Sequence, residues 1–168
     1  VYIGSNVKFQ HPGRVAIGSG SRLESNTTIR CIGKNATISI GANATLGPNA
    51  SITVVESELR IGTNFSINDW SSVDSIKANT TIGSWVRCGK HAHIGAANHD
   101  WRLSRTGDYP TIESTPLIIQ DTYIGSNVWI CSYALILAGA IIRNDSICPP
   151  YAKIDRISSN YISTKPYD

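Results

Sequence analysis

Large aliphatic residues recur along this chain with a step of six residues. The longest series runs from Ile118 to Ile154, and another runs from Ile76 to Ile94, with Cys88 and Cys148 taking two of the aliphatic places. An α-helix would repeat near 3.6 residues and a half-buried strand at two, so neither explains this step. Shorter runs with the same step are Ile17-Leu23-Ile29, Ile40-Leu46-Ile52 and Ile61-Ile67-Val73. The pattern therefore predicts repeated short strands whose aliphatic side chains share one interior.

Small and amide residues fill other places of the six-residue unit. Four residues after the aliphatic position stands a small residue such as Ala44, Ala92 or Ala134. Three residues after it stands Asn or Asp in many units, and these tolerate the left-handed backbone region that a tight corner requires. These expected corner residues are Asn6, Asn26, Asn35, Asn43, Asn49, Asn64, Asn79, Asn127 and Asp145. Each hexapeptide is thus predicted to form one strand and one corner, and three hexapeptides to form one triangular coil.

Units of this kind bury their apolar side chains only by stacking, so we expect an all-β fold, a parallel β-helix. At about 18 residues per coil, the in-register stretches correspond to about seven coils. We expect one β-helix domain over residues 1–154 and a tail over residues 155–168 that caps the last coil. Phase shifts follow Ile29, Ile38, Ile52 and Val73, and small insertions are expected to bulge from the coil at these points.

One longer stretch, residues 99–117, interrupts the repeat. Aliphatic periodicity lapses there and resumes in phase at Ile118, which is typical of a loop extruded from the coil. Loops on a rigid scaffold are where function concentrates. His99 stands where the coil gives way to this loop, and histidine is suited to general-base work near neutral pH. Asp100 is a candidate for acceptor binding or for orienting that base, with a solvated loop acid as the alternative.

Charge and composition exclude several classes of protein. The formal net charge is only +3, with scattered Lys and Arg, which argues against nucleic acid or an anionic membrane as partner. The sequence contains neither an apolar run of the roughly 18–20 residues that cross a bilayer nor a charged-then-apolar leader. The four cysteines lack metal-ligand spacing, so we expect reduced core residues in a cytoplasmic protein. Because the sequence opens in mid-pattern at Val1 without Met, we expect a trimmed N-terminus.

From about Ile61 to Arg156 the sequence resembles the maltose/galactoside O-acetyltransferase branch of the hexapeptide-repeat acyltransferases. The matching stretches are Ile61–Asn68, the His99 segment with its loop, and Ile124–Ile130. The resemblance implies a left-handed coil, a homotrimer with each site between two subunits, acetyl-CoA as donor, and a saccharide or similar small molecule as acceptor. In that family a histidine at the position of His99 is the general base.

Further site residues are expected from the same resemblance. Asn68 matches an asparagine that helps to hold the acceptor. Ser132 matches a residue that contacts the acyl donor, although Cys131 replaces the usual glycine before it. Trp129 matches the family's tryptophan and is a candidate for cofactor binding, with packing against a neighbouring subunit as the alternative.

The last coil departs from the family pattern. Gly139 and Pro150 fall in segments expected to border the cofactor channel, but residues 148–152 read Cys-Pro-Pro-Tyr-Ala where the family reads Ile-Gly-Ala-Gly-Ser. Proline has no N–H to offer a ligand. Arg156 stands where relatives place a lysine suited to a CoA phosphate. The changes bear on cofactor affinity more than on fold, and they leave open a weakened transferase or a non-catalytic scaffold or binding protein derived from one.

Two enzymes of the same fold are further alternatives. An antibiotic acetyltransferase would differ only in its acceptor pocket. A γ-carbonic-anhydrase-like enzyme needs three histidines that converge on zinc. Related zinc sites carry a His-x4-His pair, whereas His91, His93 and His99 are spaced two and six apart. The resemblance therefore implies an acetyl-CoA-dependent O-acetyltransferase, and we expect it to require no metal.

Overall fold

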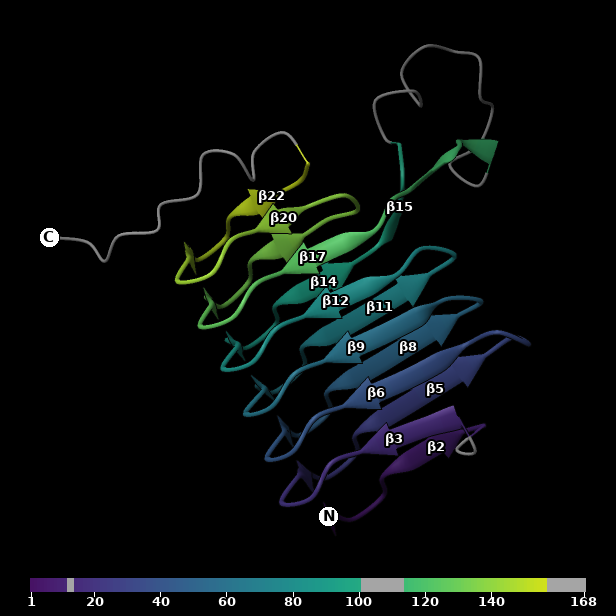
Figure 1. The fold of residues 1–168 in the computed structure, drawn as a ribbon, viewed down its shortest axis with the longest axis vertical. Helices are drawn as coiled ribbons and strands as arrows, with labels where there is room; N and C mark the ends of the chain where they lie inside the picture. The colour runs from purple at the N-terminus through teal and green to yellow at the C-terminus, as the bar shows by residue number, and fades with distance from the viewer. Residues whose placement is uncertain (12–13, 101–113, 157–168) are drawn as a thin grey trace, which may run out of the picture.

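The chain winds through three parallel sheets in turn, so that each coil contributes one short strand to each sheet (Figure 1). The computed structural model describes residues 1–11, 14–100 and 114–156. Sheet A contains β1 (Tyr2–Ile3), β4 (Arg22–Leu23), β7 (Thr45–Leu46), β10 (Ser66–Ile67), β13 (Arg87–Cys88), β18 (Trp129–Ile130) and β21 (Ile147–Cys148). Sheet B contains β2 (Lys8–Gln10), β5 (Thr28–Ile32), β8 (Ser51–Val55), β11 (Ser72–Ile76), β14 (His93–Gly95), β19 (Leu135–Ile136) and β22 (Lys153–Ile154). Sheet C contains β3 (Val15–Ile17), β6 (Thr37–Ile40), β9 (Glu58–Ile61), β12 (Thr80–Ile82), β17 (Thr122–Ile124) and β20 (Ile141–Ile142).

Each strand pairs in parallel with the equivalent strand of the neighbouring coil. In sheet A, for example, Ile67 lies between Leu46 and Cys88. The connections between sheets form three corners, which we name A–B, B–C and C–A after the sheets they join. The predicted left-handed parallel β-helix of about seven coils is confirmed. None of the described segments forms a helix long and apolar enough to span a membrane.

The interior of the coil is a stack of aliphatic side chains, as the six-residue step predicts. Ile29, Ile52 and Ile136 are completely buried in sheet B, and such burial is the main force that holds stacked repeats together. Cys88 and Cys148 are also buried, and all four cysteines are free thiols. Burial raises the pKa of Cys148 to about 12, so it is an inert core residue rather than a nucleophile.

The corners use the left-handed backbone region that the amide pattern predicts. Positive φ angles are found at Asn6, Asn26, Asn43, Asn49, Asn64, Asn127 and Asp145. Asn35 and Asn79 were expected to do the same but do not. Lys77 takes the left-handed conformation in the turn near Asn79, with φ of 57°. The Asn79 side-chain oxygen instead accepts a hydrogen bond of 2.9 Å from the Glu58 N–H, so it ties two coils together.

Three of the four expected bulges, those after Ile29, Ile52 and Val73, are replaced by longer strands in sheet B. Strands β5, β8 and β11 each have five residues and pair in register over their full length. The residues inserted after Ile29, Ile52 and Val73 therefore lie in these extensions. Insertions at equivalent points of successive coils satisfy one another's backbone groups, whereas an isolated insertion would leave an unpaired bulge.

A hairpin leaves the coil between sheets B and C (Figure 1). Strand β15 (Ala97–His99) pairs antiparallel with β16 (Leu117–Ile119), so His99 faces Leu117. The coil resumes at Thr122, whose strand pairs with β12 of the previous coil. The extruded loop predicted for residues 99–117 is confirmed by this stem. Residues 101–113 of the loop and residues 157–168 of the predicted capping tail lie outside the described residues.

Candidate functional site

His99 ends the first strand of the hairpin and is exposed to solvent. Its Nδ1 atom lies 3.1 Å from the carbonyl oxygen of Thr115 and 3.1 Å from the Thr115 hydroxyl. Thr115 is only 4% exposed, so it is a fixed point for the ring. The next residue closes the same hairpin, because the Asp100 N–H donates to the Pro116 carbonyl oxygen over 3.0 Å.

Two groups of Thr115 lie at the same distance from Nδ1 of His99: the carbonyl oxygen, which can only accept a hydrogen bond, and the hydroxyl, which can accept or donate. When Nδ1–H donates to the carbonyl oxygen, the proton of the neutral imidazole lies on Nδ1. The lone pair is then on Nε2, which is the protonation state that a general base needs. In that tautomer the exposed ring has Nε2 as its basic nitrogen.

Two of the predicted donor-binding residues lie at the same B–C corner as His99. The side-chain oxygen of Asn98 accepts a hydrogen bond of 3.2 Å from the Ala138 N–H, which joins the hairpin to this corner. Gly139 follows with φ of 80°. A Cβ atom placed on Gly139 would lie 2.3 Å from the Gln120 side chain and 3.3 Å from Cβ of Arg156. Gly139 and Arg156 are thus neighbours, and glycine is required there for both conformation and space.

The other predicted residues lie at the A–B corner. Asn68 is exposed and begins this corner in its coil, directly after β10. Ser132 stacks under the last coil, because the Tyr151 N–H donates to the Ser132 carbonyl oxygen over 3.2 Å. Pro150 precedes Tyr151 at that level and is exposed. Asn68, Ser132 and Pro150 therefore share one corner of the triangular coil.

Pro149 occupies a place where other coils use a backbone N–H. In the same position of earlier coils, the N–H groups of Asn68, Gly89 and Cys131 donate to carbonyl oxygens of the following coil. Pro149 removes that donor at the top of the described stack. Proline is a common way to close an exposed edge against further pairing. The departure from the family pattern at residues 149–150 thus has a structural explanation besides an effect on the cofactor.

One chain does not bring all the predicted residues together. His99, Asp100, Gly139 and Arg156 lie at or near the B–C corner, whereas Asn68, Ser132 and Pro150 lie at the A–B corner. The two corners are at opposite ends of the strands of sheet B. A single chain therefore keeps the two groups of predicted residues apart.

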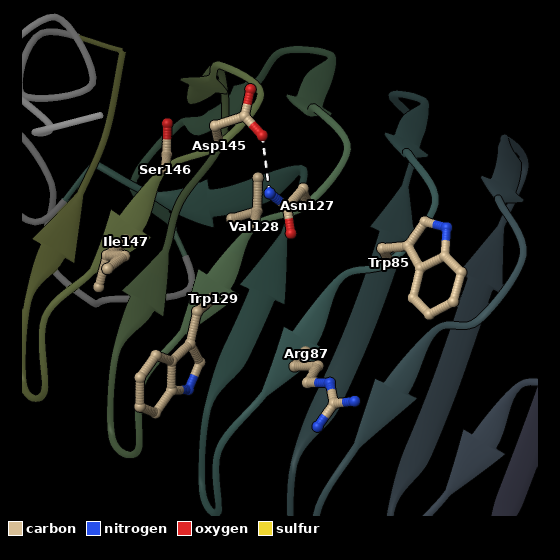
Figure 2. A pocket seen from close by; sticks show the side chains of 8 residues that line it. All are labelled: Trp85, Arg87, Asn127, Val128, Trp129, Asp145, Ser146 and Ile147. Atoms are coloured by element: carbon tan, nitrogen blue, oxygen red, sulfur yellow. Dashed lines mark hydrogen bonds between the residues drawn. The ribbon is translucent and has the colours of Figure 1, made fainter. Parts of the chain in front are cut away.

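Trp129 lies apart from both groups, on the outer face of sheet A. It lines an open groove of about 470 Å³ together with Trp85, Arg87, Asn127, Val128, Asp145, Ser146 and Ile147 (Figure 2). Arg87 and Trp129 are neighbours on adjacent strands of sheet A. Trp85 was not singled out from the sequence, although one signal was present: it stands at a corner position where the repeat calls for Asn or Asp.

Aromatic rings also replace asparagine at the A–B corner. Trp70, His91, Tyr133 and Tyr151 occupy its left-handed position in successive coils, each with positive φ. The His91 and Tyr133 rings stack at 4.9 Å, and the Tyr133 and Tyr151 rings stack at 5.0 Å. The stacked rings therefore tie successive coils together at this corner.

The remaining histidines do not converge with His99. His91 belongs to the stacked column at the A–B corner, and His93 lies on sheet B. The His93 Nδ1 atom lies 2.7 Å from the Ser72 hydroxyl and 3.8 Å from a carboxylate oxygen of Asp74. Burial raises the pKa of Asp74 more than the neighbouring His93 lowers it. Within residues 1–11, 14–100 and 114–156, no group of three or more His, Cys, Asp or Glu side chains is arranged to hold a metal ion.

The repeat, the three parallel sheets and the extruded hairpin define this chain as a hexapeptide-repeat β-helix protein. No protein-family model and no curated protein matches the sequence. Among solved structures, it is similar to a mutant of AntD, an N-acyltransferase from Bacillus cereus, in complex with dTDP and coenzyme A, with 12% identity over 91% of this chain and 81% of that chain and a TM-score of 0.49. It is also similar to the polysialic acid O-acetyltransferase OatWY, with 16% identity over 88% of this chain and 75% of that chain and a TM-score of 0.28. Neither identity is high enough to transfer the role of a residue.

Proposed function

We propose that this chain is an acyl-CoA-dependent O-acetyltransferase that moves an acetyl group from acetyl-CoA to a hydroxyl of a sugar or similar small acceptor. The observation that supports this most directly is the contact between His99 Nδ1 and the Thr115 carbonyl oxygen. In the tautomer whose Nδ1–H donates to this oxygen, Nε2 is the basic nitrogen of an exposed ring at the edge of the extruded loop. The resemblance of residues 61–156 to the maltose/galactoside O-acetyltransferase branch supplies the donor and the acceptor class.

The proposed reaction needs no covalent enzyme intermediate. His99 Nε2 takes the proton from the acceptor hydroxyl while that oxygen attacks the thioester carbonyl of acetyl-CoA. The tetrahedral oxyanion is stabilised by backbone N–H groups. It collapses when the carbon–sulfur bond breaks, and the imidazolium returns the proton to the departing thiolate. The products are the acetyl ester and free CoA.

We propose a homotrimer with the reaction site between two subunits. The support is the distribution of the expected residues over two corners of the coil, which a single chain cannot unite. In this arrangement Asn68 and Asp100 contact the acceptor. Ser132, Gly139, Pro150 and Arg156 line the path of the donor, with the Arg156 guanidinium suited to a CoA phosphate. We also propose a cytoplasmic location, because the four free cysteines fit a reducing compartment.

The test is thiol release from acetyl-CoA, measured with a panel of sugars and aminosugars as acceptors. Wild-type protein should release thiol with at least one acceptor, and His99→Ala should lower kcat by about 10²–10⁴-fold. His11→Ala is the matched control, because His11 is also exposed but lies on the first coil. Near-wild-type turnover in His99→Ala would refute the base. Wild-type protein that binds no acetyl-CoA in calorimetry would favour a non-catalytic scaffold instead.

A further inference from the structure

The groove on sheet A has the chemistry of a small-molecule site. Its volume of about 470 Å³ falls within the range of ligand pockets, roughly 300–1,000 Å³. The indoles of Trp85 and Trp129 lie on either side of the Arg87 guanidinium (Figure 2). Asn127 and Asp145 form the corner edge, where the Asn127 amide donates a hydrogen bond of 2.7 Å to the Asp145 carboxylate. The groove thus combines two indole surfaces with a guanidinium and, at its corner edge, a hydrogen-bonded amide–carboxylate pair.

Trp85 is not explained by the fold. The left-handed position of the C–A corner is occupied in successive coils by Gly20, Asn43, Asn64, Trp85, Asn127 and Asp145. Side-chain hydrogen bonds link Asn43 to Asn64 and Asn127 to Asp145, and Trp85 interrupts this ladder. It also places a bulky side chain at φ of 62°, a conformation that is unfavourable for such residues.

The unfavourable backbone conformation of Trp85 is not offset by burial of its side chain. Trp85 is 58% exposed, and Trp129 is 57% exposed. Strained backbone positions that bring no packing gain are concentrated at binding and catalytic sites. Trp70 has similar strain and exposure at another corner, so these two properties alone do not mark a ligand site. Trp85 differs from it because its indole lines a groove together with Trp129 and Arg87.

The charges of the groove narrow the class of ligand. Its lining contains one cation, Arg87, and one anion, Asp145, so the two formal charges cancel. A phosphate-bearing ligand would favour an excess of cationic groups. A neutral saccharide presents C–H faces that pack on indoles and hydroxyls that pair with guanidinium, amide and carboxylate groups. The lining matches this second set.

We propose that the groove between Trp85 and Trp129 binds an uncharged saccharide. It lies on the outer face of sheet A, whereas the residues proposed for catalysis lie at the A–B and B–C corners. Trp129 accordingly serves this groove and not the acyl donor. The inference deepens the proposed function, on which it rests for its choice of acceptor class, because it gives a glycan acceptor a second point of attachment.

Titration calorimetry with neutral tetrasaccharides, namely maltotetraose, cellotetraose and chitotetraose, tests the site. At least one should bind the wild type, and Trp85→Asn should weaken its binding at least tenfold. This change restores the residue type of the corner, so the variant is expected to fold. Trp129→Thr should weaken binding to a similar extent. This variant is also expected to fold, because Thr45 stands in the same column of sheet A. Tyr2→Thr is the matched control, because Tyr2 is 48% exposed in the same column of sheet A but lies on the first coil, away from the groove. Its affinity should stay within twofold of wild type.

Several outcomes would overturn the proposal. One is that none of the three tetrasaccharides binds the wild type. Another is that binding is unchanged in both Trp85→Asn and Trp129→Thr. ADP or CoA that binds the wild type and is weakened by Trp85→Asn would assign the groove to a nucleotide or to the donor. A change of oligomeric state in Trp85→Asn, seen by analytical ultracentrifugation, would assign it to contact between copies. Tetrasaccharide binding without any thiol release from acetyl-CoA would refute the transferase and leave this site standing.

Discussion

The Nδ1 atom of His99 and the carbonyl oxygen of Thr115 lie 3.1 Å apart across the base of the hairpin. The contact joins two segments that are 16 residues apart in the chain. It ties the two strands of the hairpin together, and an Nδ1–H that donates to this oxygen leaves Nε2 as the basic nitrogen of the ring. The same side chain therefore anchors the hairpin and is the proposed base, and a suitable substitution can separate these two roles.

Replacing His99 by Asn should separate anchoring from base catalysis. The Asn amide can still donate a hydrogen bond toward the Thr115 carbonyl oxygen, but it cannot take a proton. We expect His99→Asn to lose about 10²–10⁴-fold in kcat, as His99→Ala does, while keeping the hairpin protected from amide hydrogen exchange. Thr115→Val removes only the hydroxyl contact and should lose less than about tenfold. An active Asn variant would show that His99 is an anchor alone.

Mixed trimers should regain activity if the site lies between subunits. We expect His99→Ala and Ser132→Trp each to be inactive alone, because one removes the base and the other fills the donor path. Refolding the two variants together should restore activity, since some interfaces then combine an intact His99 with an intact Ser132. Refolding each variant alone is the control. Activity that stays at the level of the single variants would indicate that each site is built within one chain.

Trp85→Asn should make the protein more stable, in contrast to its effect on the groove. Asparagine relieves the left-handed strain and can rejoin the side-chain ladder between Asn64 and Asn127. We expect the free energy of unfolding in urea to rise by about 0.5–1 kcal/mol. Asn26→Ala is the opposite change, at φ of 61° with a ladder bond of 2.9 Å from Asn6. It should lower the same quantity by about 1 kcal/mol. If the wild type, Trp85→Asn and Asn26→Ala had the same free energy of unfolding, this explanation of the corner residues would be wrong.

Asp74 should make stability fall as the pH rises from acid. Burial raises its pKa in the folded protein above the ordinary value of 3.8. As the pH rises above 3.8, the unfolded chain therefore loses this proton before the folded one does, and unfolding becomes easier. Asp74→Asn has no proton to lose and should lack this component. Urea unfolding of both proteins from acid to neutral pH measures it. If the free energies of unfolding of the two proteins change in parallel over the whole pH range, Asp74 does not make this contribution.

The architecture could be read from the chain because it depends on a local repeat. One aliphatic residue in every six requires a strand that turns after a few residues, and Asn at the corner permits the turn. The extruded loop was predictable for the same reason, since Ile118 resumes the earlier phase. The departure from the corner pattern at Asn79 is also local, because the nearby residue Lys77 adopts the left-handed conformation there instead.

Which residues lie side by side was decided only by the stacking of the coils. Aligned residues are 21 apart between Ile67 and Cys88 but 18 apart between Ile130 and Cys148, so no fixed spacing predicts them. Trp85 and Trp129 line one groove because β13, which follows Trp85 in the chain, pairs with β18, which contains Trp129. His99 and Ser132 are placed at different corners for the same reason. A six-residue period determines that a coil forms, whereas inter-strand pairing, which depends on every insertion before it, determines what each face of the coil presents.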